Sequence, residues 1–130
     1  MSTPATALRS AAYVGDLVTV RRLLLEAVDP NVPDGYGRTA LCHAAGRGHL
    51  HVVEELLGSG AWPDLHEDYD TYPTPLMMAA SNGHLEVVQM LVAAGANPRI
   101  HSGVSQRTAE AYARSNGFSI VAKYLQTLNP

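Results

Sequence analysis

Four segments of this chain share one pattern, in which a threonine is followed nine residues later by a glycine. These threonine and glycine positions are 6 and 15, 39 and 48, 74 and 83, and 108 and 117. Successive threonines are separated by 33, 35 and 34 residues, whereas the offset of nine does not change. A constant inner offset with a variable outer spacing indicates one structural unit repeated four times, with connectors of different length.

The most regular copy, residues 74–96, predicts two helices joined by a tight turn. Thr74 can cap a helix, and Pro75 is tolerated at its first position. Asn82 and Gly83 interrupt the first helix, and a second apolar run follows as far as Gly95, which can close it in the left-handed conformation. Each unit is therefore expected to be a helix–turn–helix.

The period and the Thr74-Pro75-Leu76 motif resemble the ankyrin repeat family, over about residues 5 to 128. This resemblance implies an all-α solenoid of four helix–turn–helix repeats, joined by hairpin or finger connectors. We expect an N-terminal tail at 1–5 and a repeat domain at 6–130. The repeats are predicted at about 6–33, 34–67, 68–102 and 103–130.

Three departures from the repeat carry further expectations. Ala27 stands where a glycine would end the second helix, so we expect a less sharply closed helix there. The second connector has two extra residues and contains the only tryptophan, Trp62, and several acids. Glu110 and Arg114 replace apolar positions of the fourth repeat, which is expected to be a polar C-terminal cap.

Composition limits the classes of function. The chain of 130 residues has a net charge of −3, which argues against general affinity for nucleic acid. It contains no apolar run long enough for a membrane span, and its single cysteine, Cys42, allows no internal disulfide. We expect a monomer in the cytoplasm, the nucleus or both, without nucleic acid or membrane as a partner.

The candidate chemistry is sparse. His49 and His84 follow the inter-helix glycines, and the resemblance implies that their side chains bond the local backbone. No Cys-x-x-Cys or His-x-x-x-His spacing occurs, and the acids after Asp64 lack the glycine and glutamate of a calcium loop. Cys42 lacks the partners of a nucleophile and is expected to be a packed, inert thiol. We therefore expect no enzyme, no metal and no cofactor.

Recognition of another protein remains. Ankyrin proteins bind partners along a concave side with their finger tips and the exposed face of each first helix. Tyrosine, tryptophan and arginine are common in binding hot spots. Trp62 has two open interpretations, as a cover for the base of the finger or as a contact. The predicted partner-binding residues are Tyr13, Tyr36, Arg38, Arg47, Trp62, Glu67, Asp68, Tyr69, Asp70, Tyr72, Ser81 and Asn82.

Two kinds of partner are considered. The main hypothesis is an adaptor or scaffold. The alternative is direct inhibition of a cyclin-dependent kinase, because residues 30–38, residues 121–125 and the number of repeats are similar to ankyrin-type inhibitors of those kinases. That family shortens the first helix of its second repeat almost to a single turn, whereas residues 40–47 here form a full copy.

Overall fold

A computed structural model describes residues 3–64, 73–103 and 105–128. Those residues form eight helices and no strand. The helices are α1 (Pro4–Val14), α2 (Leu17–Leu25), α3 (Ala40–Arg47), α4 (Leu50–Gly58), α5 (Pro75–Ser81), α6 (Leu85–Ala93), α7 (Ala109–Ser115) and α8 (Ser119–Thr127). The prediction of an all-α array of four helix pairs is confirmed.

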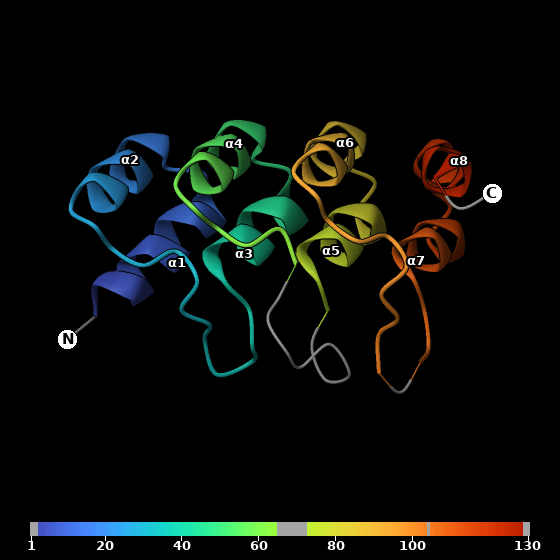
Figure 1. The fold of residues 1–130 in the computed structure, drawn as a ribbon, viewed down its shortest axis with the longest axis horizontal. Coiled ribbons are helices and arrows are strands. Elements are labelled where there is room, and N and C mark those ends of the chain that lie inside the picture. Colours follow the sequence, from blue (N-terminus) through green and yellow to red (C-terminus); the bar gives the residue numbers. More distant parts are fainter. Residues whose placement is uncertain (1–2, 65–72, 104, 129–130) are drawn as a thin grey trace.

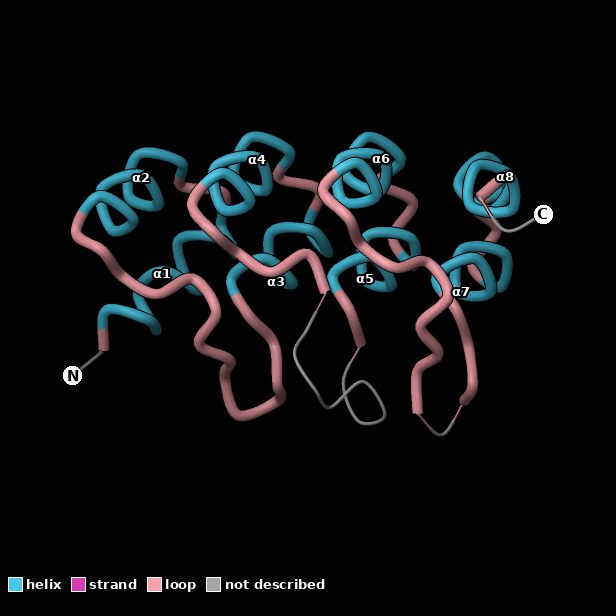
Figure 2. Tube along the Cα trace, in the orientation of Figure 1, coloured by secondary structure: helices cyan, strands magenta, loops and turns pink. Residues whose placement is uncertain are grey.

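The helices lie in two rows (Figures 1 and 2). The inner row is α1, α3, α5 and α7, and the outer row is α2, α4, α6 and α8. The described parts of the first and third connectors extend from the inner row as fingers. Neighbouring inner helices pack against one another more extensively than neighbouring outer helices do. The core lies between the rows, and its largest fully buried side chains include Leu8, Leu41, Leu56, Leu76, Met77, Leu91 and Leu125.

Threonine side chains begin the inner helices. The side chains of Thr39, Thr74 and Thr108 each accept a hydrogen bond from the backbone N–H three residues later. The first helix differs, because Thr3 is its cap and Pro4 its first residue. Thr6 therefore lies within α1, which begins two residues before the predicted start of the repeat domain.

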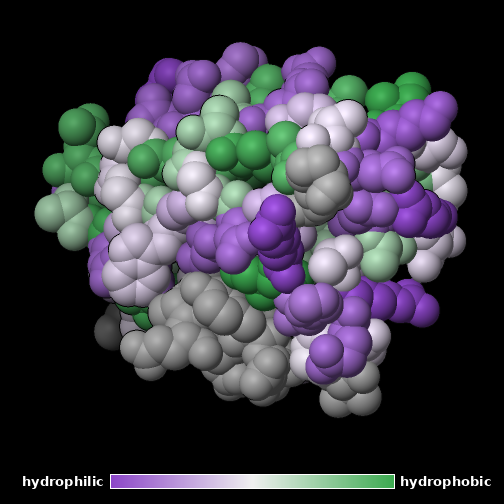
Figure 3. All heavy atoms as spheres, turned by 45° about the vertical axis from the view of Figure 1, so that its right-hand side comes forward, coloured by the Kyte–Doolittle hydropathy of each residue, from purple (hydrophilic) through white to green (hydrophobic). Residues whose placement is uncertain are grey.

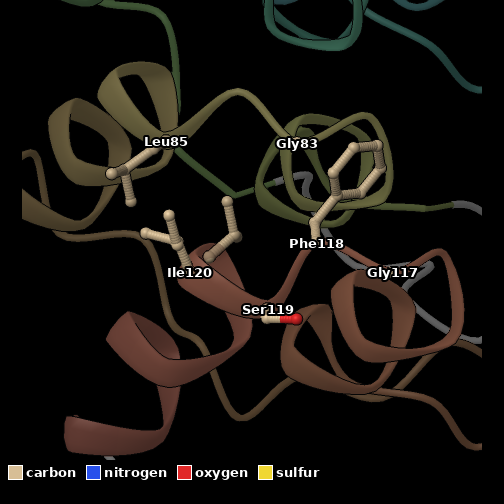
Figure 4. Close-up of a pocket in the computed structure, with 7 residues that line it drawn as sticks. Gly83, Leu85, Gly117, Phe118, Ser119 and Ile120 are labelled. Carbon is tan, nitrogen blue, oxygen red and sulfur yellow. The ribbon is translucent and has the colours of Figure 1, made fainter.

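A ring from each following repeat covers the glycine of the inter-helix turn. His49 lies over Gly15 and His84 over Gly48, and in the fourth repeat the ring over Gly83 belongs to Phe118 (Figure 4). The histidine rings also reach the previous repeat, since Nε2 of His84 lies 3.2 Å from the carbonyl oxygen of Gly46. The expectation of a local backbone bond is therefore wrong: these histidines join consecutive repeats.

The end of α2 is as sharply closed as those of α4 and α6. Ala27 adopts a left-handed φ of +64°, the conformation taken by Gly60 and Gly95 after the later outer helices. The N–H of Val28 donates to the carbonyl oxygen of Leu23 at 3.1 Å, as Ala61 does to Leu56 at 3.0 Å. The expectation of a looser end is wrong, because this closing bond holds alanine in a conformation that favours glycine.

Replacing Ala27 by glycine is expected to stabilise the fold. The left-handed conformation costs an alanine about 1–2 kcal/mol, part of which is offset because glycine makes the unfolded chain more flexible. We expect the Ala27→Gly variant to gain about 0.5–1 kcal/mol in the free energy of unfolding, measured by urea denaturation. The control is Gly95→Ala at φ +102°, where no atom lies within 4 Å of the added Cβ. It should lose stability, and a loss in both variants would contradict the strain at Ala27.

The described residues form no broad apolar patch on the surface seen in Figure 3. Green apolar atoms emerge there between purple polar ones. Large exposed apolar side chains are found mainly near the two ends of the array and include Val14, Val18, Leu25 and Ile120. Scattered single apolar residues are normal on protein surfaces. Clusters of polar and aromatic side chains are therefore better candidates for a binding site.

Candidate functional site

The first finger, residues 30–38, is held by the side chain of Asp34. Its Oδ1 accepts hydrogen bonds from the N–H groups of Tyr36 (2.8 Å) and Arg38 (3.0 Å). Burial raises the pKa of Asp34, but the N–H groups of Arg38 and Tyr36 and the ring of His43 stabilise the carboxylate, so its pKa lies below the usual value. The finger thereby presents Tyr36 at its tip, where the residue is 76% exposed.

The finger is tied to the inner helices through His43. Nε2 of His43 on α3 lies 3.1 Å from Oδ2 of Asp34. The ring of Tyr13 on α1 meets the His43 ring edge-on, with centroids 5.8 Å apart. Three segments that are distant in sequence therefore meet at this histidine.

Arg47 completes the cluster. Its guanidinium lies over the Tyr13 ring, 4.6 Å from the centroid, and its Nη1 is 3.4 Å from the Tyr13 hydroxyl. The structure thus brings together two predicted residues, Tyr13 and Arg47, with two that the sequence analysis did not select, Asp34 and His43. The spacing of His43 and Arg47, i and i+4 on one helix, could have indicated a shared face.

Beside this cluster is a first hollow of about 410 Å³, lined in part by Arg9, Tyr13, Asp34 and His43. Arg9 is already engaged, because its guanidinium donates to the carbonyl oxygen of Val32 (2.9 Å) and to the hydroxyl of Thr6 (3.1 Å). We define the inner face as the exposed side of α1, α3, α5 and α7 together with the first finger.

A second hollow of about 300 Å³ lies farther along the inner face. It is lined by Arg38, Met77, Met78, Ser81, Asn82 and Tyr112, among others. Three of these, Arg38, Ser81 and Asn82, are predicted partner-binding residues. The methionines and Tyr112 were not predicted, because only the packing of α5 beside α7 brings them together.

Ser81 and Asn82 already form hydrogen bonds to other parts of the array. The Asn82 amide donates to the carbonyl oxygens of Gly46 and Met78, each at 3.0 Å. The carbonyl oxygen of Ser81 accepts from the Asn116 amide at 2.8 Å. These bonds join α3 to α5 and α5 to α7, so both residues have a structural role in addition to their predicted one.

The second connector is described only at its two ends. The backbone N–H of Trp62 donates to Oδ1 of Asn31 at 2.8 Å, while the residue is 53% exposed, so both interpretations of its side chain stay open. Burial raises the pKa of Asp64, although the N–H of Asn97 donates to its carboxylate. The predicted contacts Glu67, Asp68, Tyr69, Asp70 and Tyr72 lie outside the described residues.

Cys42 is a packed thiol. It is completely buried, its sulfur accepts a hydrogen bond from the Thr39 hydroxyl at 3.5 Å, and burial raises the pKa of its thiol. A thiol without solvent contact and with a raised pKa is a poor nucleophile. This arrangement agrees with the expectation that Cys42 is inert.

Within residues 3–64, 73–103 and 105–128, no group of three or more His, Cys, Asp or Glu side chains is placed to hold a metal ion. None of the helices in the described part of the chain combines the length and the apolar character needed to cross a bilayer.

Comparison with known proteins agrees with the geometry. A family model described as ankyrin repeats (3 copies) matches residues 8–102 and 62–129. The chain is 50% identical to the human Ankyrin repeat domain-containing protein 39 over 52 residues, which are 40% of this chain and 28% of that protein. It is 49% identical over 47 residues to the rat mitochondrial Glutaminase liver isoform, and these are 36% of this chain and 8% of that enzyme. The chain therefore covers less than a third of either relative.

Proposed function

Because the chain belongs to the ankyrin repeat family, we propose that it is a non-catalytic adaptor or scaffold that binds another protein through its inner face. Ankyrin repeats are in general protein–protein interaction modules. The similarity to a glutaminase involves 8% of that enzyme, so it carries no argument for the same activity here. A fold of this kind supports many functions, and the proposal therefore depends on the site.

The cluster of Tyr13, His43 and Arg47 beside the first finger carries this proposal. Tyr13 is 45% exposed and Tyr36 is 76% exposed, and both are presented by well-anchored segments. Exposed aromatic and arginine side chains held in fixed positions offer a large contact area at a small entropic cost. Such an arrangement favours binding of a folded partner or of an extended segment of one.

Inhibition of a cyclin-dependent kinase remains the alternative. It depends on the sequence similarity at residues 30–38 and 121–125. The full length of α3, Ala40–Arg47, speaks against it, since the inhibitors have a shortened helix at this place. A panel of monomeric cell-cycle kinases would separate the two: inhibition at micromolar concentration or below favours the alternative, and no inhibition favours an adaptor.

The proposed function is tested by affinity capture followed by mass spectrometry. The inner-face variant replaces Tyr13, Tyr36 and Arg47 by alanine. We expect its recovery of the specific partner to fall at least about tenfold, because hot-spot residues each contribute more than about 1 kcal/mol.

The matched control replaces Val18, Leu25 and Ile120 of the outer helices by alanine, since all three are more than two-thirds exposed at 78%, 87% and 71%. This control should capture the partner as the wild type does, and both variants should keep the helical circular dichroism of the wild type. If the inner-face variant captured as much partner as the wild type, the proposed site would be wrong.

A further inference from the structure

The second hollow has an apolar wall formed by residues from two helices. Met77 and Met78 line it from α5, and Tyr112 lines it from α7, the neighbouring inner helix (Figure 1). The Tyr112 hydroxyl donates to the Ser102 hydroxyl at 2.8 Å, which holds the ring in place. Methionine side chains adapt to the shape of an inserted group. The wall therefore suits an apolar side chain.

Two arginines lie at or beside this wall. Arg38 lines the hollow from the first finger. Arg107, in the third connector, lies over the Tyr112 ring with its guanidinium 5.9 Å from the centroid. Both arginines are exposed, and no ion pair joins either to a carboxylate of the described residues. Within the described residues, no carboxylate neutralises their charges.

The described acids Glu110 and Asp34 already pair with other groups. Glu110 on α7 pairs with Arg114 at 2.8 Å. Asp34 accepts the backbone N–H groups of its own finger and lies 3.1 Å from His43. Although the whole chain has a net charge of −3, the charged side chain among the described lining residues is Arg38, and Arg107 adds a second positive charge beside Tyr112. A ligand segment of negative charge would complement these two charges.

The size and chemistry of the hollow favour a peptide. Its volume of about 300 Å³ is at the lower end of the roughly 300–1,000 Å³ typical of small-molecule pockets, which suits a single side chain. A nucleic acid would need a more extended basic face than two arginines provide. A peptide can readily place one apolar side chain between acidic side chains.

We propose that the second hollow accepts one apolar side chain of an acidic peptide segment, whose carboxylates on either side pair with Arg38 and Arg107. This inference rests on the proposed function, because it specifies the partner chemistry of the same inner face. It makes affinity dependent on both the apolar group and the salt concentration, since exposed charges are screened over about 10 Å at 0.1 M salt.

The probe is a fluorescent nonapeptide with one central leucine and four glutamates on each side. Three comparison ligands are the same peptide with central glycine, the same peptide with lysines in place of glutamates, and a single-stranded oligonucleotide of nine thymidines. We expect the leucine–glutamate peptide to bind at least about tenfold more tightly than each of the others, with affinity falling as salt rises. Equal binding of the glycine peptide or of the oligonucleotide would overturn the inference.

Charge reversal tests the rim. The Arg38→Glu/Arg107→Glu variant should bind the probe at least about tenfold more weakly, because two attractive pairs become repulsive. The control Lys123→Glu makes a charge reversal at an exposed position of α8, on the outer row, and should bind as the wild type does. Unchanged binding by the double variant would also overturn the inference.

Failure here is distinguishable from failure of the proposed function. If the chain does not bind the acidic probe but captures a partner in a manner that depends on Tyr13, Tyr36 and Arg47, the proposed function is supported and this inference is refuted. If the chain captures its partner equally well after those three residues are replaced, the proposed function is refuted instead.

Discussion

The Gly48→Ala variant is expected to lose about 3 kcal/mol in the free energy of unfolding. Gly48 has a φ of +75°, which is unfavourable for alanine by about 1–2 kcal/mol. The added Cβ would lie 2.6 Å from Nδ1 and 2.7 Å from Cε1 of His84. The ring would have to move, which weakens its bond to the Gly46 carbonyl and adds about 1–3 kcal/mol of overpacking.

The chain provides a matched control for this variant. Gly117 has a similar φ of +82°, but no atom lies within 4 Å of the position of its Cβ. Gly117→Ala therefore has only the backbone cost and should lose about 1 kcal/mol. Urea denaturation followed by circular dichroism measures both losses. Equal losses would show that the ring over the glycine does not stabilise the junction between repeats.

The second large effect is expected at a buried helix cap. Thr74 is 1% exposed, and its hydroxyl accepts the N–H of Met77 at 3.1 Å. Thr74→Val retains the shape of the side chain and leaves a buried N–H without a partner, which costs about 1–3 kcal/mol. We expect a loss of about 2 kcal/mol in the free energy of unfolding.

Thr3 is the control for this substitution. It caps α1 by accepting the N–H of Thr6 at 3.1 Å, but it is exposed. Water can replace its hydroxyl, so Thr3→Val should cost about 0.5 kcal/mol. If the two valine variants were destabilised equally, burial of the cap would not be the source of the effect.

The helix pairs could be predicted because the residues that begin and end each helix act locally. A capping threonine and a breaking glycine act within a few residues of their own position, so the offset of nine was informative. The same locality explains the errors. Thr6 has the repeat register but Thr3 caps the helix, and Ala27 closes α2 because its neighbours' hydrogen bonds impose the left-handed conformation.

The candidate site was predictable only in part. Tyr13 and Arg47 were selected as exposed residues of first helices, and the structure places them in contact. The roles of Asp34 and His43 were missed because they depend on a finger folding back onto α3. Tyr112 and Met78 were missed for the same reason, since they meet only where α5 packs beside α7. Contacts between repeats are not encoded in the spacing within one.

The most direct test of an inner-face binding module is a nuclear magnetic resonance titration of the isotope-labelled chain with the partner recovered by affinity capture. Amide resonances of the inner face, at Tyr13, Tyr36, Arg38, Arg47 and Met78, are expected to shift most. Resonances of the outer helices α2, α4, α6 and α8 should change little. Shifts concentrated on the outer helices, with the inner face unchanged, would contradict the account.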